Sequence, residues 1–239
     1  MQAEPVARHG VPWRWALRIC GVWAGGLTTM LALVAALNPP SVTRAILGMA
    51  AGLGILWIGL GGAFELVLRE PARRAARPFT RVWPVAFVVG ATTLALIEEA
   101  IATGMTNTAP LWGTTWQQAH ITASNNYFEV VAFHSVVVFI PMFIAWAWLL
   151  HRYTFHPNAV LLLFGCNGVI GETLSFGAQN LLMFGFWVYV YGLIVYLPAY
   201  AFAPLQRGRN AGKVAHLLAL TLPTLASVPV ALLVLALHH

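Results

Sequence analysis

The sequence predicts an all-α membrane protein, a polytopic bundle of about seven transmembrane helices that forms one domain over residues 1–239. The first observation behind this fold class is composition. Hydrophobic residues make up 59% of the 239 residues and charged residues only 8%, whereas about a quarter of the residues in a soluble domain are charged. So few charges could not cover a surface that faces water. We therefore expect most of the surface to face lipid.

The second observation is a series of seven apolar stretches, each long enough for the roughly 20 residues that a bilayer-crossing helix needs. Polar segments, or segments rich in Arg, Pro and Gly, separate them. The first stretch could also be a signal peptide, but it is long and no clean cleavage motif follows it, so we expect a helix. The stretches cover residues 13–37, 45–68, 80–104, 127–150, 158–176, 181–203 and 214–237.

The loop arginines predict that the N-terminus lies in the cytoplasm and the C-terminus outside, because cytoplasmic loops carry an excess of Lys and Arg. With this orientation, only Arg44 of the 13 basic residues is outside. We expect an integral multi-pass protein, in the cell membrane if the source is prokaryotic, and no nucleic-acid partner. The other 12 basic residues are Arg8, Arg14, Arg18, Arg69, Arg73, Arg74, Arg77, Arg81, Arg152, Arg207, Arg209 and Lys213.

The long connection from Thr106 to Asn126 is the one large break between apolar stretches. It contains no Lys or Arg but carries Trp112 and Trp116. Trp is enriched at the boundary between membrane and water. We expect this connection to lie along the outer membrane interface.

Four of the seven acidic residues fall in one outer layer of the predicted bundle. Glu98 and Glu99 are near the outer end of the third stretch, Glu129 opens the fourth, and Glu172 comes late in the fifth. An ionisable side chain inside a membrane is costly unless it is paired or faces a wet cavity, and it marks a candidate functional site. We expect these carboxyl groups to converge in one dry pocket.

Each acid also has an ordinary explanation. Glu129 could sit where it does because a helix start favours negative charge. Glu98 and Glu99 are about 100° apart on a helix, so one, with Glu98 favoured, should face the bundle and the other a neighbouring element. Glu172 has apolar sequence directly before it and is the hardest to explain in this way. Glu65 lies four residues before Arg69 and is expected to form a structural ion pair with it.

Cofactor and metal signals are weak. Glu129 and His134 are five residues apart, about 140° round a helix, and could not easily bind one ion. No His-Glu-x-x-His motif and no glycine-rich phosphate loop are present. Cys20 and Cys166 lie in apolar stretches and are expected to be free thiols. We therefore expect no cofactor and no metal, although a metal-dependent membrane enzyme remains one alternative.

Six short pieces follow one another in a recognisable order over residues 79–203. They are Leu96-Ile97-Glu98-Glu99, Asn126-Tyr127-Phe128-Glu129-Val130, Phe139-Ile140-Pro141, His156-Pro157, Gly171-Glu172, and Trp187-Val188-Tyr189 through Leu197-Pro198. Their order resembles the EXPERA family of emopamil-binding sterol isomerases and the sigma-2 receptor, with 1–78 and 205–239 as additional helices. One departure is Thr92-Thr93-Leu94, where the family isomerases place a His before the first acid.

A second resemblance is to the small membrane lycopene cyclases, which also carry a Glu-Glu pair in a helix. The proline that usually precedes that pair is missing, since Leu96 and Ile97 stand there. Both resemblances imply proton-transfer chemistry on a double bond of an isoprenoid or sterol-like lipid that enters from the bilayer. An apolar environment can keep a carboxylic acid protonated at neutral pH, so that it can donate a proton to carbon.

The resemblances imply a role for each candidate residue. Glu129 and either Glu98 or Glu99 would act as acid and base, and Glu172 would support them. Four residues, Asn126, His134, Trp187 and Tyr191, would bind the hydrophobic substrate. The main alternative is a non-enzymatic receptor or transporter, in which the same carboxyl groups bind a cationic or lipid ligand or relay protons.

Overall fold

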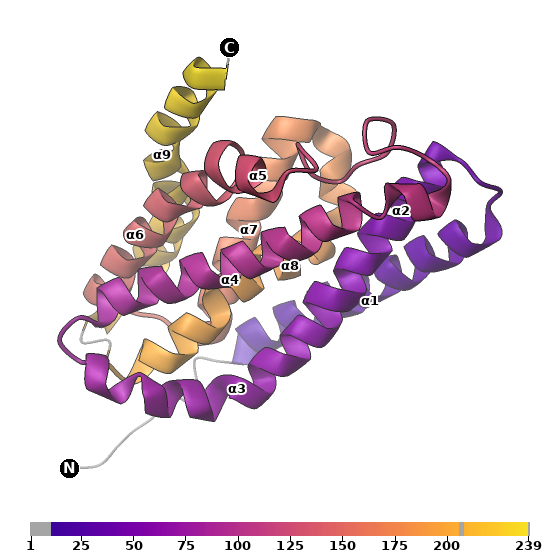
Figure 1. Cartoon of the computed structure of the whole chain (residues 1–239). Helices are drawn as coiled ribbons and strands as arrows, with labels where there is room; N and C mark the ends of the chain where they lie inside the picture. The colour runs from indigo at the N-terminus through magenta and orange to yellow at the C-terminus, as the bar shows by residue number, and fades with distance from the viewer. Residues whose placement is uncertain (1–10, 206–207, 239) are drawn as a thin grey trace.

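The computed structural model describes residues 11–205 and 208–238, and in this part the chain is almost entirely helical. The long helices pack side by side in a bundle (Figure 1). Their bounds are α1 (Val11–Leu37), α2 (Val42–Leu53), α3 (Gly62–Ala75), α4 (Trp83–Thr106), α5 (Tyr127–Phe133), α6 (Val136–Arg152), α7 (Pro157–Phe176), α8 (Phe184–Phe202) and α9 (Lys213–His238).

Shorter elements join these helices. A π-helical segment, η2 (Gly54–Gly61), makes α2 and α3 one continuous helix from Val42 to Ala75. The 3-10 turns are η3 (Arg77–Phe79), η4 (Ala109–Trp112), η5 (Ala178–Met183) and η6 (Ala203–Leu205), and the two short strands are β1 (Tyr153–Thr154) and β2 (Arg209–Asn210).

The prediction of an all-α polytopic bundle is confirmed. In the described part of the chain, six helices are long and apolar enough to cross a membrane, and the bent pair of α5 and α6 makes a seventh span. All seven predicted stretches therefore have a counterpart.

The fourth span differs from the single helix predicted over 127–150, because it is broken between α5 and α6 and bends by 46°. The break is at His134 and Ser135. Both the backbone N–H of Ser135 (3.0 Å) and its hydroxyl (3.3 Å) donate to the carbonyl of Val130. A side-chain hydroxyl that competes for a backbone carbonyl disturbs the regular helical ladder, which accounts for the break.

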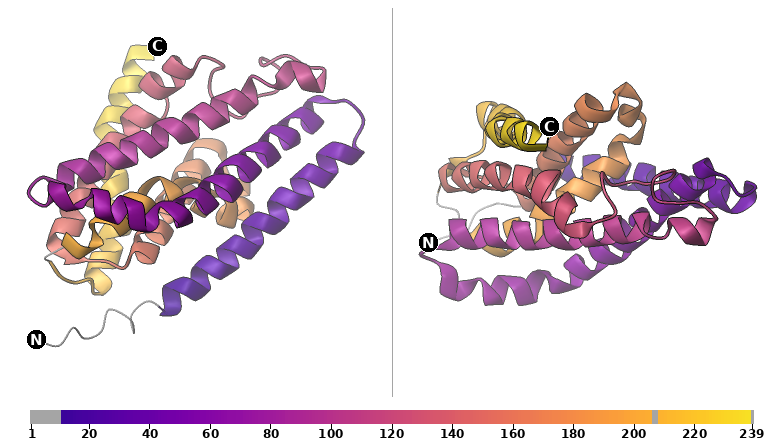
Figure 2. Two further views of the ribbon diagram at one scale, coloured as in Figure 1. Left: turned by 60° about the horizontal axis from the view of Figure 1, so that its bottom comes forward. Right: turned by 45° about the horizontal axis from the view of Figure 1, so that its top comes forward.

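The basic loops gather at one end of the bundle. Strand β1 pairs in parallel with β2, which brings the connection after α6 beside the connection before α9. At this end the ring of Trp13 also stacks on that of His216, with 5.1 Å between centroids. Arg44, in contrast, follows the turn between α1 and α2, where its guanidinium lies 5.9 Å from the ring of Trp112. The left view of Figure 2 shows that the start of α1 and the end of α9 lie at opposite ends of the bundle.

The predicted orientation requires the basic loops to lie together at one end of the bundle, because they would all face the cytoplasm. Arg8 and Arg207, which belong to the same predicted cytoplasmic set, lie outside the described residues.

The connection from Thr106 to Asn126 folds onto the end of α2. The ring of Trp112 lies so close to Gly48 that a Cβ there would come within 2.3 Å of the indole. Ala45 and Met49 of α2 form a small apolar cluster with Ala109 and Ala119 of the connection. The connection thus has a packed position of its own, and its place along a membrane interface stays a prediction.

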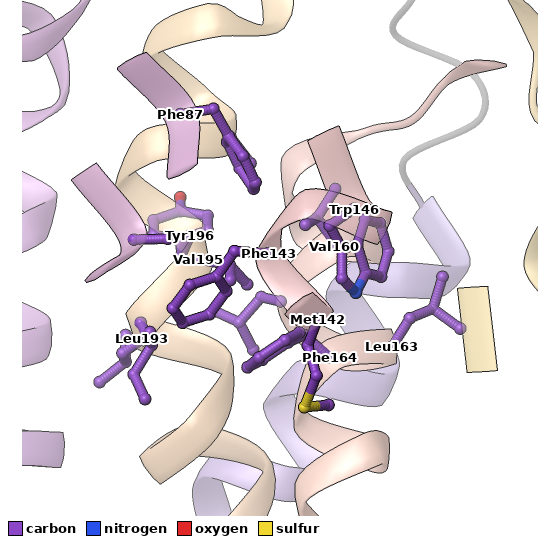
Figure 3. Packing of buried hydrophobic residues seen from close by; sticks show 14 of the residues in the cluster. Phe87, Met142, Phe143, Trp146, Val160, Leu163, Phe164, Leu193, Val195 and Tyr196 are labelled. Atoms are coloured by element: carbon purple, nitrogen blue, oxygen red, sulfur yellow. The ribbon is translucent and has the colours of Figure 1, made fainter. Parts of the chain in front are cut away.

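The core lies where α4, α6, α7 and α8 meet, and aromatic rings pack in it among aliphatic side chains (Figure 3). Phe143 and Phe164 are fully buried, with ring centroids 5.6 Å apart. Helices α7 and α8 approach closely because Gly165 faces the α8 backbone: a Cβ there would lie 2.4 Å from the carbonyl oxygen of Val188. Small residues permit such close packing of membrane helices. This contact sets the position of α7 relative to α8 in the site described next.

Candidate functional site

Helix α4 carries two adjacent carboxyl groups into the protein interior. Glu98 is 5% exposed and Glu99 is 8% exposed. Glu99 lies near the side chain of Ser135, at the break between α5 and α6. The bend in the fourth span therefore places a hydroxyl beside a buried carboxyl group.

Glu172 of α7 joins these two side chains. Glu98 interacts electrostatically with both Glu99 and Glu172, and Glu99 also interacts with Glu172. Glu172 is half-buried near the end of its helix. Three of the four predicted carboxyl groups thus share one site, contributed by two helices that are far apart in the sequence. We call Glu98, Glu99 and Glu172 the carboxyl cluster.

Tyr191 of α8 connects the carboxyl cluster to an aromatic wall. Its hydroxyl donates a hydrogen bond to Oε1 of Glu172, and it also interacts electrostatically with Glu98 and Glu99. Its ring passes over Gly168 of α7, where a Cβ would lie only 2.0 Å from Cδ2 of the tyrosine. Gly168 is therefore needed for Tyr191 to reach Glu172.

Two further aromatic rings flank Tyr191. Phe139 of α6 meets it edge-on at 5.8 Å, and Trp187, one turn earlier in α8, lies at 6.1 Å between ring centroids. The indole N–H of Trp187 donates to Oδ1 of the buried Asn180 (3.1 Å), and the amide of Asn180 donates to the backbone carbonyl of Glu172 (3.4 Å). The predicted aromatic pair therefore lies beside the carboxyl cluster.

Glu129 and Asn126 occupy the start of α5. Asn126 caps this helix, with its Oδ1 accepting from the backbone N–H groups of Phe128 (3.0 Å) and Glu129 (3.4 Å). Half-buried Glu129 accepts a hydrogen bond from the hydroxyl of Ser124 (2.8 Å). Both features agree with the helix-start explanation of Glu129. Catalytic and binding roles for these two residues stay predictions.

His134 is exposed and stands at the C-terminal end of α5, immediately before Ser135. Its backbone N–H donates to the carbonyl of Val130 (3.0 Å). The predicted contact of His134 with a substrate stays a prediction.

Three residues of the site were not predicted from the sequence: Ser135, Phe139 and Tyr127. The hydroxyl of Tyr127 donates to the backbone carbonyl of Leu96 (3.0 Å) and lies in the neighbourhood of Glu99. Ser135 could have been found, because it is the only Ser or Thr between residues 127 and 150. Phe139 carries no comparable signal, since aromatic residues are frequent throughout this segment.

The predicted ion pair between Glu65 and Arg69 is wrong. Glu65 is 3% exposed, and neither of its carboxylate oxygens has a hydrogen-bond partner in the described structure. Arg69 instead reaches α8, where it donates to the hydroxyl of Tyr196 (3.2 Å) and lies 5.5 Å from the ring centroid of Tyr200. A neighbouring helix that offers both an acceptor and an aromatic face competes successfully with a partner one turn away.

A metal site needs several donor side chains directed at one point. Among the described residues, no three His, Cys, Asp or Glu side chains are arranged to hold a metal ion. The carboxyl cluster thus brings its members near one another without directing them at one point. Cys20 and Cys166 are both free thiols, as expected.

The resemblances of this chain to the EXPERA family and to the small membrane lycopene cyclases stay predictions. No protein-family model matches the chain, and no match was found among curated proteins or solved structures.

Proposed function

We propose that this protein is a membrane-embedded enzyme that isomerises or cyclises an isoprenoid or sterol-like lipid by moving protons between carboxyl groups and a carbon–carbon double bond. The observation that carries the proposal is the carboxyl cluster itself. Glu98, Glu99 and Glu172 interact with one another inside an apolar bundle, and the partners identified for them, Ser135 and Tyr191, are uncharged.

The carboxyl cluster suits proton transfer because it can contain a protonated and an ionised carboxyl group at the same time. Three ionised carboxyl groups at close range in an apolar interior repel one another strongly, so at least one is expected to carry a proton. A protonated and an ionised carboxyl group side by side supply an acid and a base.

The reaction balances without an external oxidant or reductant. One of Glu98 and Glu99 gives its proton to a carbon of the double bond, which leaves a positive charge on the neighbouring carbon. The other removes a proton from an adjacent carbon, so the double bond moves or a ring closes. Glu172, oriented by Tyr191, and the faces of Trp187 and Phe139 stabilise the transient cation by charge and by cation–π attraction.

A second candidate function is a receptor or transporter, in which the same cluster binds a cation or relays protons. The observation that favours it is again that Ser135 and Tyr191, the partners identified among the described residues, are uncharged, because a group of ionised carboxyl side chains attracts positive charge.

Deuterium labelling tests the enzyme proposal for any lipid substrate of this class. The purified protein is reconstituted into vesicles that contain an isoprenoid lipid extract, in D₂O, and the lipids are analysed by mass spectrometry and NMR. We expect deuterium bound to carbon in a lipid whose double bond has moved. The variants E98Q, E99Q and E172Q should lose this labelling, whereas E70Q, a substitution of the same chemistry at an exposed position, should retain it.

The same experiment separates the two candidates. Loss of labelling in the three variants, with binding of the isoprenoid lipid retained, supports the enzyme. Absence of carbon-bound deuterium in the wild-type protein, together with cation or proton flux that depends on Glu98 and Glu172, would contradict the enzyme and support the transporter. The variant E129Q, measured alongside, shows whether the fourth carboxyl group takes part.

A further inference from the structure

A second site lies away from the carboxyl cluster, at the end of the bundle that carries the basic loops. It consists of two adjoining hollows that share Ala76 and Ala201 as lining residues. The first is an apolar groove of about 560 Å³ between α3, α4 and α8, and the second is a polar pocket of about 480 Å³ next to it. Both volumes fall within the range of about 300–1,000 Å³ that is usual for ligand sites.

The polar pocket is basic. Arg73, Arg74 and Arg77 line it, together with one acidic residue, Glu70. The carboxylate of Glu70 already accepts a hydrogen bond from the hydroxyl of Tyr200 (2.7 Å). The three arginines are exposed, and their guanidinium groups can bind a phosphate group through paired hydrogen bonds. The charge of the pocket therefore favours an anion.

The groove has the length of one leaflet. It follows α4 from Val82 to Leu94, a separation of twelve residues or about 18 Å along a helix, while half of a bilayer's hydrocarbon core is about 15 Å. Thr93 is the one groove residue with a polar side chain, and its hydroxyl donates to the carbonyl of Val89 in its own helix (2.9 Å). The groove thus offers a continuous apolar surface to a chain lying parallel to α4.

We propose that this joined site binds an anionic phospholipid of the cytoplasmic leaflet. Its phosphate group lies among Arg73, Arg74 and Arg77, and one acyl chain lies in the groove between α3, α4 and α8. A basic pocket at the cytoplasmic ends of membrane helices is the arrangement that recognises anionic headgroups. The inference does not depend on the proposed reaction, since the site shares no residue with the carboxyl cluster.

Native mass spectrometry of the full-length protein in detergent tests this site, with phosphatidylglycerol and phosphatidylcholine of identical acyl chains as the probes. We expect the wild-type protein to retain phosphatidylglycerol on the order of tenfold better. The triple variant R73Q/R74Q/R77Q should lose this preference. R73K/R74K/R77K, which keeps the charges, should keep most of it, which shows that any loss is not caused by misfolding. A matched control, R14Q/R18Q/R152Q, removes three exposed charges elsewhere and should behave as the wild type.

The groove is tested by A86W, which fills it, against A63W, which places the same side chain at an exposed position outside it. A86W should lower retention of phosphatidylglycerol and A63W should not.

Equal retention of the two lipids by the wild type would overturn the proposal, as would an unchanged preference in R73Q/R74Q/R77Q. Complete displacement of the lipid by millimolar inorganic phosphate, with A86W behaving as the wild type, would show a free-anion site instead. A stable dimer that loses the lipid site on association would show that a second copy covers the groove.

Discussion

At the scale of single residues, the interior of this protein contains carboxyl groups in two different situations. Glu172 accepts a hydrogen bond from Tyr191 and belongs to the carboxyl cluster, whereas Glu65 is buried with neither oxygen paired in the described structure. A buried polar group without a partner costs free energy, and one with a partner costs much less. The two acids should therefore respond in opposite ways to substitution.

The hydrogen bond from Tyr191 can be removed by the substitution Y191F, which keeps the aromatic ring. If Glu172 must be held in place for the proposed reaction, turnover should fall on the order of 100-fold, the usual effect of removing one preorganised donor. The measurement is the rate of carbon-bound deuterium incorporation. The control is Y189F in the same helix, which removes a hydroxyl that donates to the carbonyl of Leu17 (3.0 Å). Equal losses in both variants would contradict the role of Tyr191.

Replacing Glu65 by an apolar residue of similar size should stabilise the protein. The variant E65M removes a buried carboxyl group that has no hydrogen bond in the described structure, and we expect a gain of about 1–3 kcal/mol in the free energy of unfolding. Thermal unfolding in detergent measures it. E70Q serves as the comparison, because Glu70 is exposed and accepts a hydrogen bond from Tyr200. A large loss of stability in E65M would show that the carboxyl group of Glu65 is paired in the membrane.

At the scale of secondary-structure elements, two contacts position the carboxyl cluster. Helices α7 and α8 pack closely through glycines, which brings Tyr191 over Gly168 and to Glu172. The break between α5 and α6 presents Ser135 to Glu99. Neither contact involves an unusual residue type. Both contacts depend on the local shape of one helix at the point where another helix crosses it.

Gly168 and Gly171 of α7 form a matched pair for testing this packing. The variant G168A adds a Cβ that would lie 2.0 Å from the ring of Tyr191, whereas the space around Gly171 is open within 4 Å. G168A should lose about 1–3 kcal/mol of stability through overpacking, together with much of its activity. G171A should be neutral or slightly stabilising, because Ala favours a helix more than Gly does. Similar effects of both substitutions on thermal unfolding would disprove the proposed contact.

The start of α7 should make stability depend on pH. Nδ1 of His156 accepts a hydrogen bond from the backbone N–H of Asn158 (3.1 Å), and burial, together with the nearby positive charge of Arg14, lowers the pKa of His156 below its usual 6.5. The unfolded chain therefore binds a proton first as the pH falls. The contribution of His156 is fully present above about 6.5 and is lost as the pH falls toward its folded pKa.

Thermal unfolding of the wild type and of H156N between mildly alkaline and mildly acidic pH tests this. Asn keeps a capping acceptor but does not titrate. The wild type should lose more stability than H156N over this range. Parallel pH profiles would show that His156 contributes nothing to the dependence.

At the scale of the whole molecule, the distribution of charge is the organising feature. The described basic loops share one end of the bundle and Arg44 lies away from them, while Glu98 and Glu99 of the carboxyl cluster are buried between helices. The proposed lipid site uses the charged end, and the proposed reaction uses the apolar interior. On these two proposals, lipid binding and proton transfer take place in different parts of the bundle.

The predicted orientation can be measured with single cysteines in a chain that carries C20A and C166A. T80C is an exposed position beside the basic loops, and Q117C is an exposed position in the long connection between α4 and α5. A membrane-impermeant maleimide should label Q117C in intact cells and T80C only after the membrane is opened. Labelling in the reverse order would invert the topology and would place the proposed lipid site in the other leaflet.

The sequence by itself determined the all-α bundle, its number of spans and the approximate bounds of each helix, because these depend on local apolar length and on charge, which can be read along the chain. It also singled out Glu98, Glu99, Glu172, Trp187 and Tyr191. These residues attract attention in a single sequence because acids are rare in apolar stretches and the aromatic residues cluster in one helix.

Only the tertiary structure decided which of these residues meet. The Tyr191–Glu172 hydrogen bond, the place of Ser135 beside Glu99 and the separation of Arg69 from Glu65 all depend on where one helix crosses another. The lipid-sized groove has the same origin, since α3, α4 and α8 form it together. Helix crossings follow from packing between residues far apart in the chain, and the apolar side chains that make these contacts look alike in sequence whether they face a neighbouring helix or lipid.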